Sequence, residues 1–193
     1  MFSKIVRRTH MYLALFLTPW VLMYALSTMA MNHRDLFRAP PQFQTEREQS
    51  YAAAFPPDAK PRQVAEQILR DLRLEGAFGV QGPARDGRLT IVRQDPVTPR
   101  RILYTPGAGK LVIERMVFRT SAFLEHLHRR RGYQQPYALE DTWAFSVDLV
   151  IVAMVFWVLS GLWMWWEMRL TRLWGALFAL FGVALFAFFL VTI

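Results

Sequence analysis

The chain has 193 residues, of which 53% are hydrophobic, and it carries a formal net charge of +8 and no cysteine. The lack of cysteine excludes disulfides, thiolate ligands, iron–sulfur clusters and covalently attached c-type haem. The sequence also contains no Gly-rich phosphate loop, no Ser/His/Asp arrangement and no dinucleotide fingerprint. No basic run is interleaved with a nucleic-acid-binding motif, so we expect no nucleic-acid partner.

Three long apolar blocks contain no charged residue, and they cover positions 11–31, 149–166 and 173–193. A bilayer core about 30 Å thick needs about 20 apolar residues in a helix, and helices satisfy their own backbone groups in lipid. We therefore expect a membrane protein with three transmembrane helices that contact the lipid bilayer. With their flanking tails, these helices fall within residues 1–33, 144–166 and 173–193.

The first apolar block has an alternative interpretation as a signal peptide, because Lys4 and Arg7 precede it as an n-region would. Its apolar run exceeds the usual length of about 7–15 residues, and the only cleavage-like sequence, at 28–30, is a poor one. An uncleaved helix, kinked modestly at Pro19, is therefore the favoured interpretation.

The middle of the chain has the pattern of a small α+β domain. Residues 34–59 are rich in proline and charge, which predicts a linker lying over the membrane surface. Helical periodicity runs over 61–74, ended by Gly76, and short β-type runs separated by turn residues follow at 77–81, 89–94, 100–105 and 110–118. We expect residues 60–118 to fold as one domain, inserted between the first two membrane helices. The predicted core side chains are Val64, Ile68, Leu72, Ile91 and Ile102.

Residues 119–143 are predicted to form an amphipathic helix and an interfacial segment. The helical pattern covers 120–131, with Thr120 or Ser121 as the cap and Gly132 as the end. Tyr137 and Trp143 mark the approach to the membrane interface.

The distribution of basic residues predicts the orientation. Lys4, Arg7 and Arg8 precede the first helix, and two arginines lie in the 167–172 connection between the last two. Three spans put these two segments on the same side, which favours the cytoplasm. The arginines around the middle domain flank a loop of over a hundred residues, and long loops count little in this rule. We expect a cytoplasmic N-terminus and a periplasmic or otherwise extracytoplasmic domain, in the inner (cytoplasmic) membrane of a bacterium.

Several short motifs resemble those of one family. The sequence of the first helix contains Arg7-Arg8-Thr9-His10, then Ala14-Leu15, Ser27-Thr28 and Asn32-His33; the later ones are Leu127-His128 and Ser160-Gly161-Leu162-Trp163. In this arrangement, the chain resembles the PepSY-associated transmembrane proteins, and the segment from about 61 to 117 resembles a PepSY domain. Alanine and threonine replace two glycines of the family pattern. Pro106-Gly107-Ala108-Gly109 also departs from the Asp-x-x-Thr-Gly turn that often ends the PepSY sheet.

The resemblance raises the possibility of b-type haem, since larger relatives include ferric–siderophore reductases that hold haem through histidines. His10 and His33 are 23 positions apart, or about 35 Å along a helix, so they cannot share one haem. His33 lies on the same side as His126 and His128, which point to opposite faces of their helix, so only one should face the first helix. The family pattern selects His128. The haem hypothesis therefore has His33 and His128 as axial ligands, with Arg34 and Arg129 on the propionates.

Each of these residues also has a structural interpretation. Interfacial histidines are common without being ligands, arginines there contact lipid phosphates, and His10 has no partner histidine on its side of the membrane. Asp148 is an ionisable residue within a predicted span and hence a functional candidate by default.

Three functions therefore stay open. The first is a haem-b electron-transfer or reductase subunit, which would need other membrane subunits or a homo-oligomer to carry electrons across the bilayer. The second is a membrane-anchored PepSY binding module for an extracytoplasmic partner. The third is an accessory subunit of a larger membrane complex. The sequence does not decide whether the chain is an enzyme.

Overall fold

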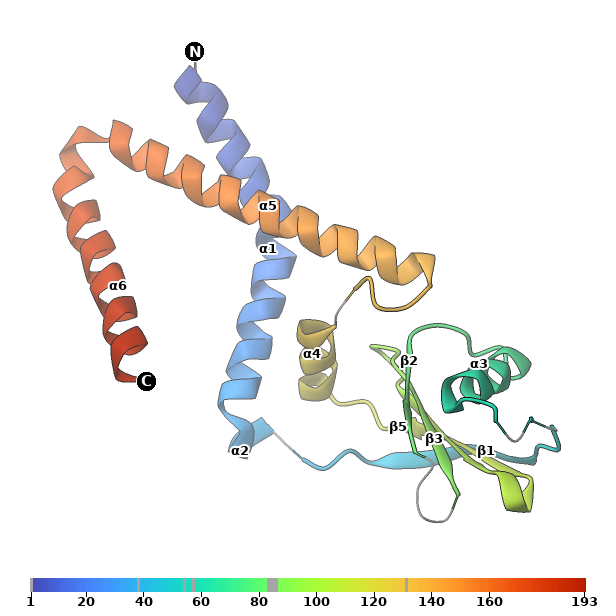
Figure 1. Ribbon diagram of the computed structural model, residues 1–193. Helices are drawn as coiled ribbons and strands as arrows, with labels where there is room; N and C mark the ends of the chain where they lie inside the picture. Colours follow the sequence, from blue (N-terminus) through green and yellow to red (C-terminus); the bar gives the residue numbers. More distant parts are fainter. Residues whose placement is uncertain (1, 38, 54, 57, 83–86, 131) are drawn as a thin grey trace. The chain divides into compact units, whose positions relative to one another are not determined.

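The computed structural model describes residues 2–37, 39–53, 55–56, 58–82, 87–130 and 132–193. Its helices and strands follow one another as α1, α2, β1, α3, β2, β3, β4, β5, α4, α5 and α6 (Figure 1). The chain divides into two compact units. One contains Met1–Val21 and Ser146–Ile193, and the other contains Leu22–Phe145.

Three helices are long and apolar enough to cross a membrane, as the three apolar blocks predict. They are α1 (Phe2–Asn32), α5 (Ala138–Glu167) and α6 (Arg172–Thr192), with a short 3-10 turn, η2 (Arg169–Thr171), between the last two. α5 begins earlier than the predicted start at 144, because Glu140 and Asp141 in its first turn are favourable next to the positive end of the helix dipole.

In the first unit, α1 packs against α5. Leu17, Val150 and Ala153 are buried at this contact, and the small side chain of Ala153 lets the helices approach closely. At one end of the pair, the Ser3 hydroxyl donates a hydrogen bond of 2.6 Å to Glu167, and Arg7 lies 3.9 Å from the same carboxylate. The N-terminal end of α1 therefore meets the C-terminal end of α5.

The second unit is built around a five-stranded antiparallel sheet with the order β1-β5-β4-β3-β2. The strands are β1 (Phe43–Ser50), β2 (Phe78–Gln81), β3 (Leu89–Arg93), β4 (Arg100–Thr105) and β5 (Lys110–Met116). One face is covered by α3 (Pro61–Asp71), whose Val64, Ala65, Ile68 and Leu69 pack on the sheet core.

The predicted core is confirmed at four of its five positions. Val64, Ile68, Ile91 and Ile102 are buried, while Leu72 is half-buried at the edge of the cluster. Burying such side chains stabilises the domain by about 1.5–3 kcal/mol each.

Strand β1 corrects the expectation of a linker over residues 34–59. This segment contains the short helix α2 (Arg34–Phe37) and then β1, which pairs antiparallel with β5. The sequence of β1, FQTEREQS, has no apolar alternation because the strand lies at the sheet edge and most of its side chains are exposed. Charged edge strands are typical, since charge prevents pairing with other chains.

The end of α3 also differs from the prediction. The helix ends before Gly76, because Arg73 takes the left-handed conformation (φ 54°) and its N–H and that of Leu74 bond back to Arg70 and Leu69. Gly76 has another role, since a Cβ there would lie 2.3 Å from the guanidinium of Arg93. That guanidinium donates hydrogen bonds to the carbonyls of Leu74 and Ala77.

The turns between the strands agree with the sequence where they are described. The β4–β5 connection is the 3-10 turn η1 (Pro106–Ala108), followed by Gly109 in the left-handed region at φ 55°. In the β2–β3 turn, Gly87 has φ 73°, and Asp86 lies outside the described residues. β3 ends at Arg93, and the Asp95 carboxylate accepts N–H groups from Val97 and Thr98.

After the sheet, α4 (Thr120–Arg129) lies beside the second half of α1 (Figure 1). Its N-cap is Arg119, without a side-chain hydrogen bond, rather than the predicted Thr120 or Ser121. Ser121 instead donates to the carbonyl of Phe37, and Arg119 donates to the carbonyls of Phe37 and Ala39. These bonds are made to the chain just after α1, so both side chains are engaged in tertiary contacts.

Candidate functional site

His128 is held against the second half of α1. Its Nδ1 lies 2.7 Å from the hydroxyl of Ser27, which is fully buried. The ring also meets the edge of Tyr24, with centroids 5.0 Å apart and planes at 76°. Because Ser27 and Tyr24 lie one turn apart, both face α4. The Ser27-Thr28 and Leu127-His128 motifs are therefore in direct contact.

The hydrogen bonds of Ser27 orient the imidazole. The hydroxyl lies 2.9 Å from the carbonyl of Tyr24, to which it can donate, and 2.7 Å from Nδ1 of His128. In the tautomer with the proton on Nδ1, the hydroxyl accepts from His128 and Nε2 keeps a free lone pair. Histidines that bind metals commonly have their other ring N–H held in this way.

His33 is placed differently from His128. It lies at the turn after α1, solvent-exposed, with its N–H bonded to the carbonyl of Met29. Six residues separate it from Ser27, which corresponds to about 9 Å of rise and about 120° of rotation around the helix. Among the described residues, no hydrogen bond or ring contact joins His33 to His128.

A cavity of about 370 Å³ lies where α1 passes into α2. Its lining includes Arg34, Arg129 and His126, together with apolar side chains from the last turn of α1 (Ala30, Met31) and from α4, the end of β5 and the segment after α2. The structure thus brings Arg34 and Arg129 together, but around His126 rather than His128.

The two histidines of α4 have different surroundings, and His128 is the one that bonds to α1, as the sequence predicts. His128 packs directly on α1, whereas His126 shares the cavity with Met31 and Arg34. The cavity that His126 lines also includes Phe37, Pro41 and the end of β5.

The charge around the cavity is positive. The cavity lining contains three arginines, Arg34, Arg119 and Arg129, and one carboxylate, that of Glu125. Glu125 pairs with Arg129 at 3.0 Å. Partial desolvation lowers the pKa of His126; the attraction of Glu125 opposes this shift, and repulsion by Arg129 adds to it. At neutral pH the imidazole is therefore uncharged and offers one donor and one acceptor.

His10 belongs to a second histidine–serine pair, in the first unit. Its Nδ1 lies 2.9 Å from the hydroxyl of Ser160, and its ring stacks on Trp157 with centroids 5.6 Å apart. Gly161 permits this approach, since a Cβ there would lie 3.3 Å from the imidazole. The Ser160-Gly161 motif therefore provides the surface on which His10 packs.

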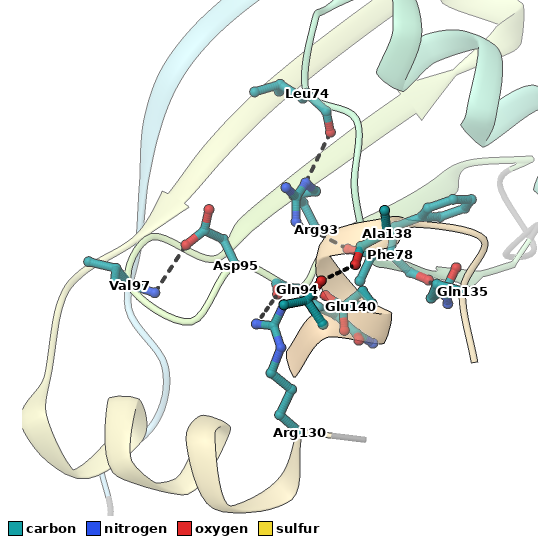
Figure 2. Close-up of polar contacts among 12 residues, drawn as sticks. Leu74, Phe78, Arg93, Gln94, Asp95, Val97, Arg130, Gln135, Ala138 and Glu140 are labelled. Atoms are coloured by element: carbon teal, nitrogen blue, oxygen red, sulfur yellow. Dashed lines mark hydrogen bonds and ion pairs between the residues drawn. The ribbon is translucent and has the colours of Figure 1, made fainter. Parts of the chain in front are cut away.

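A buried ion pair joins the end of α4 to the start of α5 (Figure 2). The guanidinium of Arg130 contacts the carboxylate of Glu140, which is 5% exposed, and also donates to the carbonyl of Gln94 at the end of β3. Gln135 donates from the intervening loop to the carbonyl of Phe78 in β2. These contacts connect the sheet to the N-terminal turn of the second membrane-length helix, α5.

The partners of these groups cannot be read from the sequence. Ser27 and Ser160 belong to short motifs, but their pairing with His128 and His10 depends on how helices far apart in sequence come together. Arg130 and Glu140 carry no sequence signal of burial. Asp148 lies on the exposed side of α5. Among the described residues, no three His, Asp or Glu side chains form a cluster that could hold a metal ion.

Comparison with known proteins adds one finding. The model of a family described as PepSY_TM-like matches residues 1–193. No curated protein and no solved structure matches the chain.

Proposed function

The chain belongs to the PepSY_TM-like family of membrane proteins, and from this premise we propose that it is an accessory subunit of a larger membrane assembly. In this role α1 and α5 anchor the α+β domain at the membrane, and α6 packs against another membrane subunit or a second copy of the chain. The domain faces the periplasm of a bacterium, where it is available to an extracytoplasmic partner.

The observation that carries this proposal is the environment of α6. None of its residues is buried within the chain, whereas α1 and α5 bury Leu17 and Val150 against each other. Helices in a bilayer associate by close packing, and small residues such as Gly182, which has nothing within 4 Å of its Cβ position, favour such contacts. The first turn of α6 contacts the end of α5, where Gly175 lies against Trp165 and Arg172 bonds to the Trp166 carbonyl. The exposed surface of the following turns is available to a partner.

Site-specific photo-crosslinking in living cells tests the role of α6. A photoreactive amino acid is placed singly at Phe178, Leu180, Phe181 and Val183, which are all exposed and point in different directions around the helix. A subunit contact predicts protein adducts at one or two adjacent directions and none at the others. Mass spectrometry of the adduct then distinguishes a second copy of the chain from another protein.

The matched control places the same amino acid at Leu26 of α1, which is also exposed. Lipid adducts alone at all four α6 positions would contradict the accessory role. Protein adducts of equal yield in all four directions and at Leu26 would indicate nonspecific crowding, which contradicts it as well.

A haem-b subunit is the second candidate, and the orientation of His128 favours it. With Nδ1–H held by Ser27, Nε2 is positioned as a metal-binding nitrogen. His128 is the axial ligand that this orientation supports, and His33 stays the candidate for the second axial position. A bound haem would supply one-electron chemistry at the membrane.

The absorption spectrum of protein purified from haem-replete cells tests this candidate. A haem ligated by His128 predicts a b-type spectrum that is lost in His128→Ala and retained in His126→Ala and His10→Ala. Purified protein without haem absorbance would remove this candidate and leave the accessory role unaffected.

A further inference from the structure

The cavity beside α4 lies at the C-terminal end of the membrane-length helix α1. Ala30 and Met31, in the last turn of the membrane-length helix α1, form one part of its lining, and Arg34 follows directly in α2. The remaining lining comes from the segment after α2, the end of β5 and α4. A ligand in this cavity therefore sits at the boundary between lipid and water.

The lining is suited to an anion. Three arginines and one glutamate face the cavity, which gives a net charge of +2 (three minus one) with His126 neutral. Among the described residues, Arg34 has no hydrogen-bond or ion-pair partner, so its guanidinium is free for a ligand. Guanidinium groups bind phosphate oxygens through two parallel hydrogen bonds. The cavity volume of about 370 Å³ falls within the range of small-ligand sites.

The surroundings of the cavity are apolar and exposed. Leu36, next to the lining residue Phe37, is 79% exposed, and Phe118, between the lining residues Val117 and Arg119, is 56% exposed. A free phosphate would use the arginines and leave these side chains in water. An amphiphile with an anionic head and acyl chains would contact both the arginines of the cavity and these apolar side chains.

From these observations we infer that the cavity binds the phosphate headgroup of an anionic phospholipid, with Arg34 and Arg129 on the phosphate and the acyl chains beside Leu36 and Phe118. The site goes beyond the proposed accessory role, and it stands whether or not α6 has a partner. It gives the chain a lipid-dependent contact at the point where α1 joins the extramembrane domain.

Native mass spectrometry of the full chain tests the site. The protein is reconstituted into nanodiscs of equal parts phosphatidylglycerol and phosphatidylcholine, then released in mild detergent, and the retained lipids are identified. Wild type should retain one phosphatidylglycerol in preference to phosphatidylcholine. Arg34→Gln and Arg129→Gln should each lower this preference about fivefold.

Arg169→Gln is the matched control, because it removes the same charge at a membrane-proximal position in η2, outside the cavity. It should keep the wild-type preference. An equal loss in Arg169→Gln would show that the lipid is held by general surface charge and would overturn the site.

Glu125→Gln separates lipid binding from a merely structural role. Removing this carboxylate releases Arg129 from its ion pair and raises the charge of the cavity, so phosphatidylglycerol retention should increase. If Arg129 and Glu125 mattered only by stabilising α4, both substitutions would lower retention. A decrease in Glu125→Gln would therefore contradict the proposal.

The source of the phosphate is decided by competition. Inorganic phosphate and glycerol phosphate, added in large excess over protein, should leave the bound phosphatidylglycerol in place because neither contacts Leu36 or Phe118. Displacement by either anion would assign the cavity to a soluble phosphate ligand and overturn the lipid assignment. Ala122→Phe, which fills the cavity without changing its charge, should also abolish retention.

Discussion

His10 and His128 occupy corresponding settings in the two units. Each imidazole Nδ1 is bonded to a serine whose hydroxyl is committed to the carbonyl three residues earlier, Trp157 for Ser160 and Tyr24 for Ser27. When the serine proton lies on that carbonyl, the serine oxygen accepts a hydrogen bond from the Nδ1–H tautomer of the histidine. The two pairs differ in what surrounds them, since His10 stacks on a tryptophan and His128 meets a tyrosine edge.

Ser160→Ala tests the structural value of the first pair. It removes the hydrogen-bond partner of His10 and should lower the stability of the α1–α5 contact by about 0.6 kcal/mol, the average for hydrogen bonds between membrane helices. Thermal unfolding of the detergent-solubilised chain measures the change. Thr18→Ala is the control, because that hydroxyl bonds only to Ala14 of its own helix. Equal effects of the two substitutions would contradict a specific His10–Ser160 contact.

Glu140→Gln tests the buried ion pair. Neutralising this carboxylate leaves Arg130 largely buried without a counter-charge and should destabilise the unit by about 3 kcal/mol. Hydrogen exchange of the strands and of the first turns of α5 should show faster opening. Glu66→Gln, which breaks the exposed i,i+4 pair with Arg62, should cost only about 0.3–0.5 kcal/mol. Protection unchanged by Glu140→Gln would mean that the pair does not join the sheet to α5.

At the scale of the strands, a β-bulge in β1 places a carboxylate beside a row of three arginines in the sheet. Arg93, Arg100 and Arg115 lie directly opposite one another across β3, β4 and β5, and like charges in such positions destabilise a sheet. The register of β1 shifts between Thr45 and Arg47, and the intervening Glu46 reaches across β5 to bond Arg100 at 2.8 Å. The bulge therefore directs a carboxylate toward the arginine row.

The bulge predicts a pH dependence of sheet stability. The hydrogen bond from Arg100 holds the pKa of Glu46 below its usual value of 4.5, with the charges of Arg100 and Arg115 acting in the same direction and desolvation opposing. Between the pKa of Glu46 in the folded chain and its higher pKa in the unfolded chain, the unfolded chain binds more protons, so stability rises with pH. The contribution is complete above the unfolded value and is lost as the pH falls through the lowered pKa. Because Glu46 is partly exposed, it amounts to about 0.5 kcal/mol.

Comparison of wild type with Glu46→Gln at matched pH measures this contribution. Hydrogen exchange of β1 and β5 should show wild type more stable at about pH 6, with the difference vanishing toward about pH 3. Using the difference between the two proteins cancels the pH dependence of the exchange chemistry itself. A difference that stays constant over this range would show that the Glu46 charge does not stabilise the sheet.

The elements that could be predicted from sequence are those with a periodic apolar face. Ile68 on α3 and Ile91 and Ile102 in the sheet follow helical and alternating patterns, so their burial was predictable. Strand β1 has no such pattern, because it is held at the sheet edge by main-chain pairing with β5 and by polar side-chain contacts such as Glu46 with Arg100. The site shows the same division, since the motif residues could be identified from sequence, but the pairing of His128 with Ser27 depends on tertiary packing.

At the scale of the whole molecule, the contacts of Glu167 bear on the orientation. Ser3 and Arg7 bond to this residue, so the start of α1 and the end of α5 lie at the same end of the first unit. That is the arrangement expected if α1 and α5 cross the membrane in opposite directions. The basic residues Arg7 and Arg169 then share one side, and the positive-inside rule predicts that this side faces the cytoplasm.

Paired reporter fusions test this orientation. With three spans, alkaline phosphatase, which is active only outside the cytoplasm, should be active when fused after Ile193, while green fluorescent protein at the same position should stay dark. Fusion after Met168, which removes α6, should reverse both results because the reporter then follows two spans. The reversal is the internal control, since it depends on α6 crossing the membrane and not on expression level. Fluorescence after Ile193 together with phosphatase activity after Met168 would place the α+β domain in the cytoplasm. Identical results at both fusion positions would show that α6 does not span the bilayer.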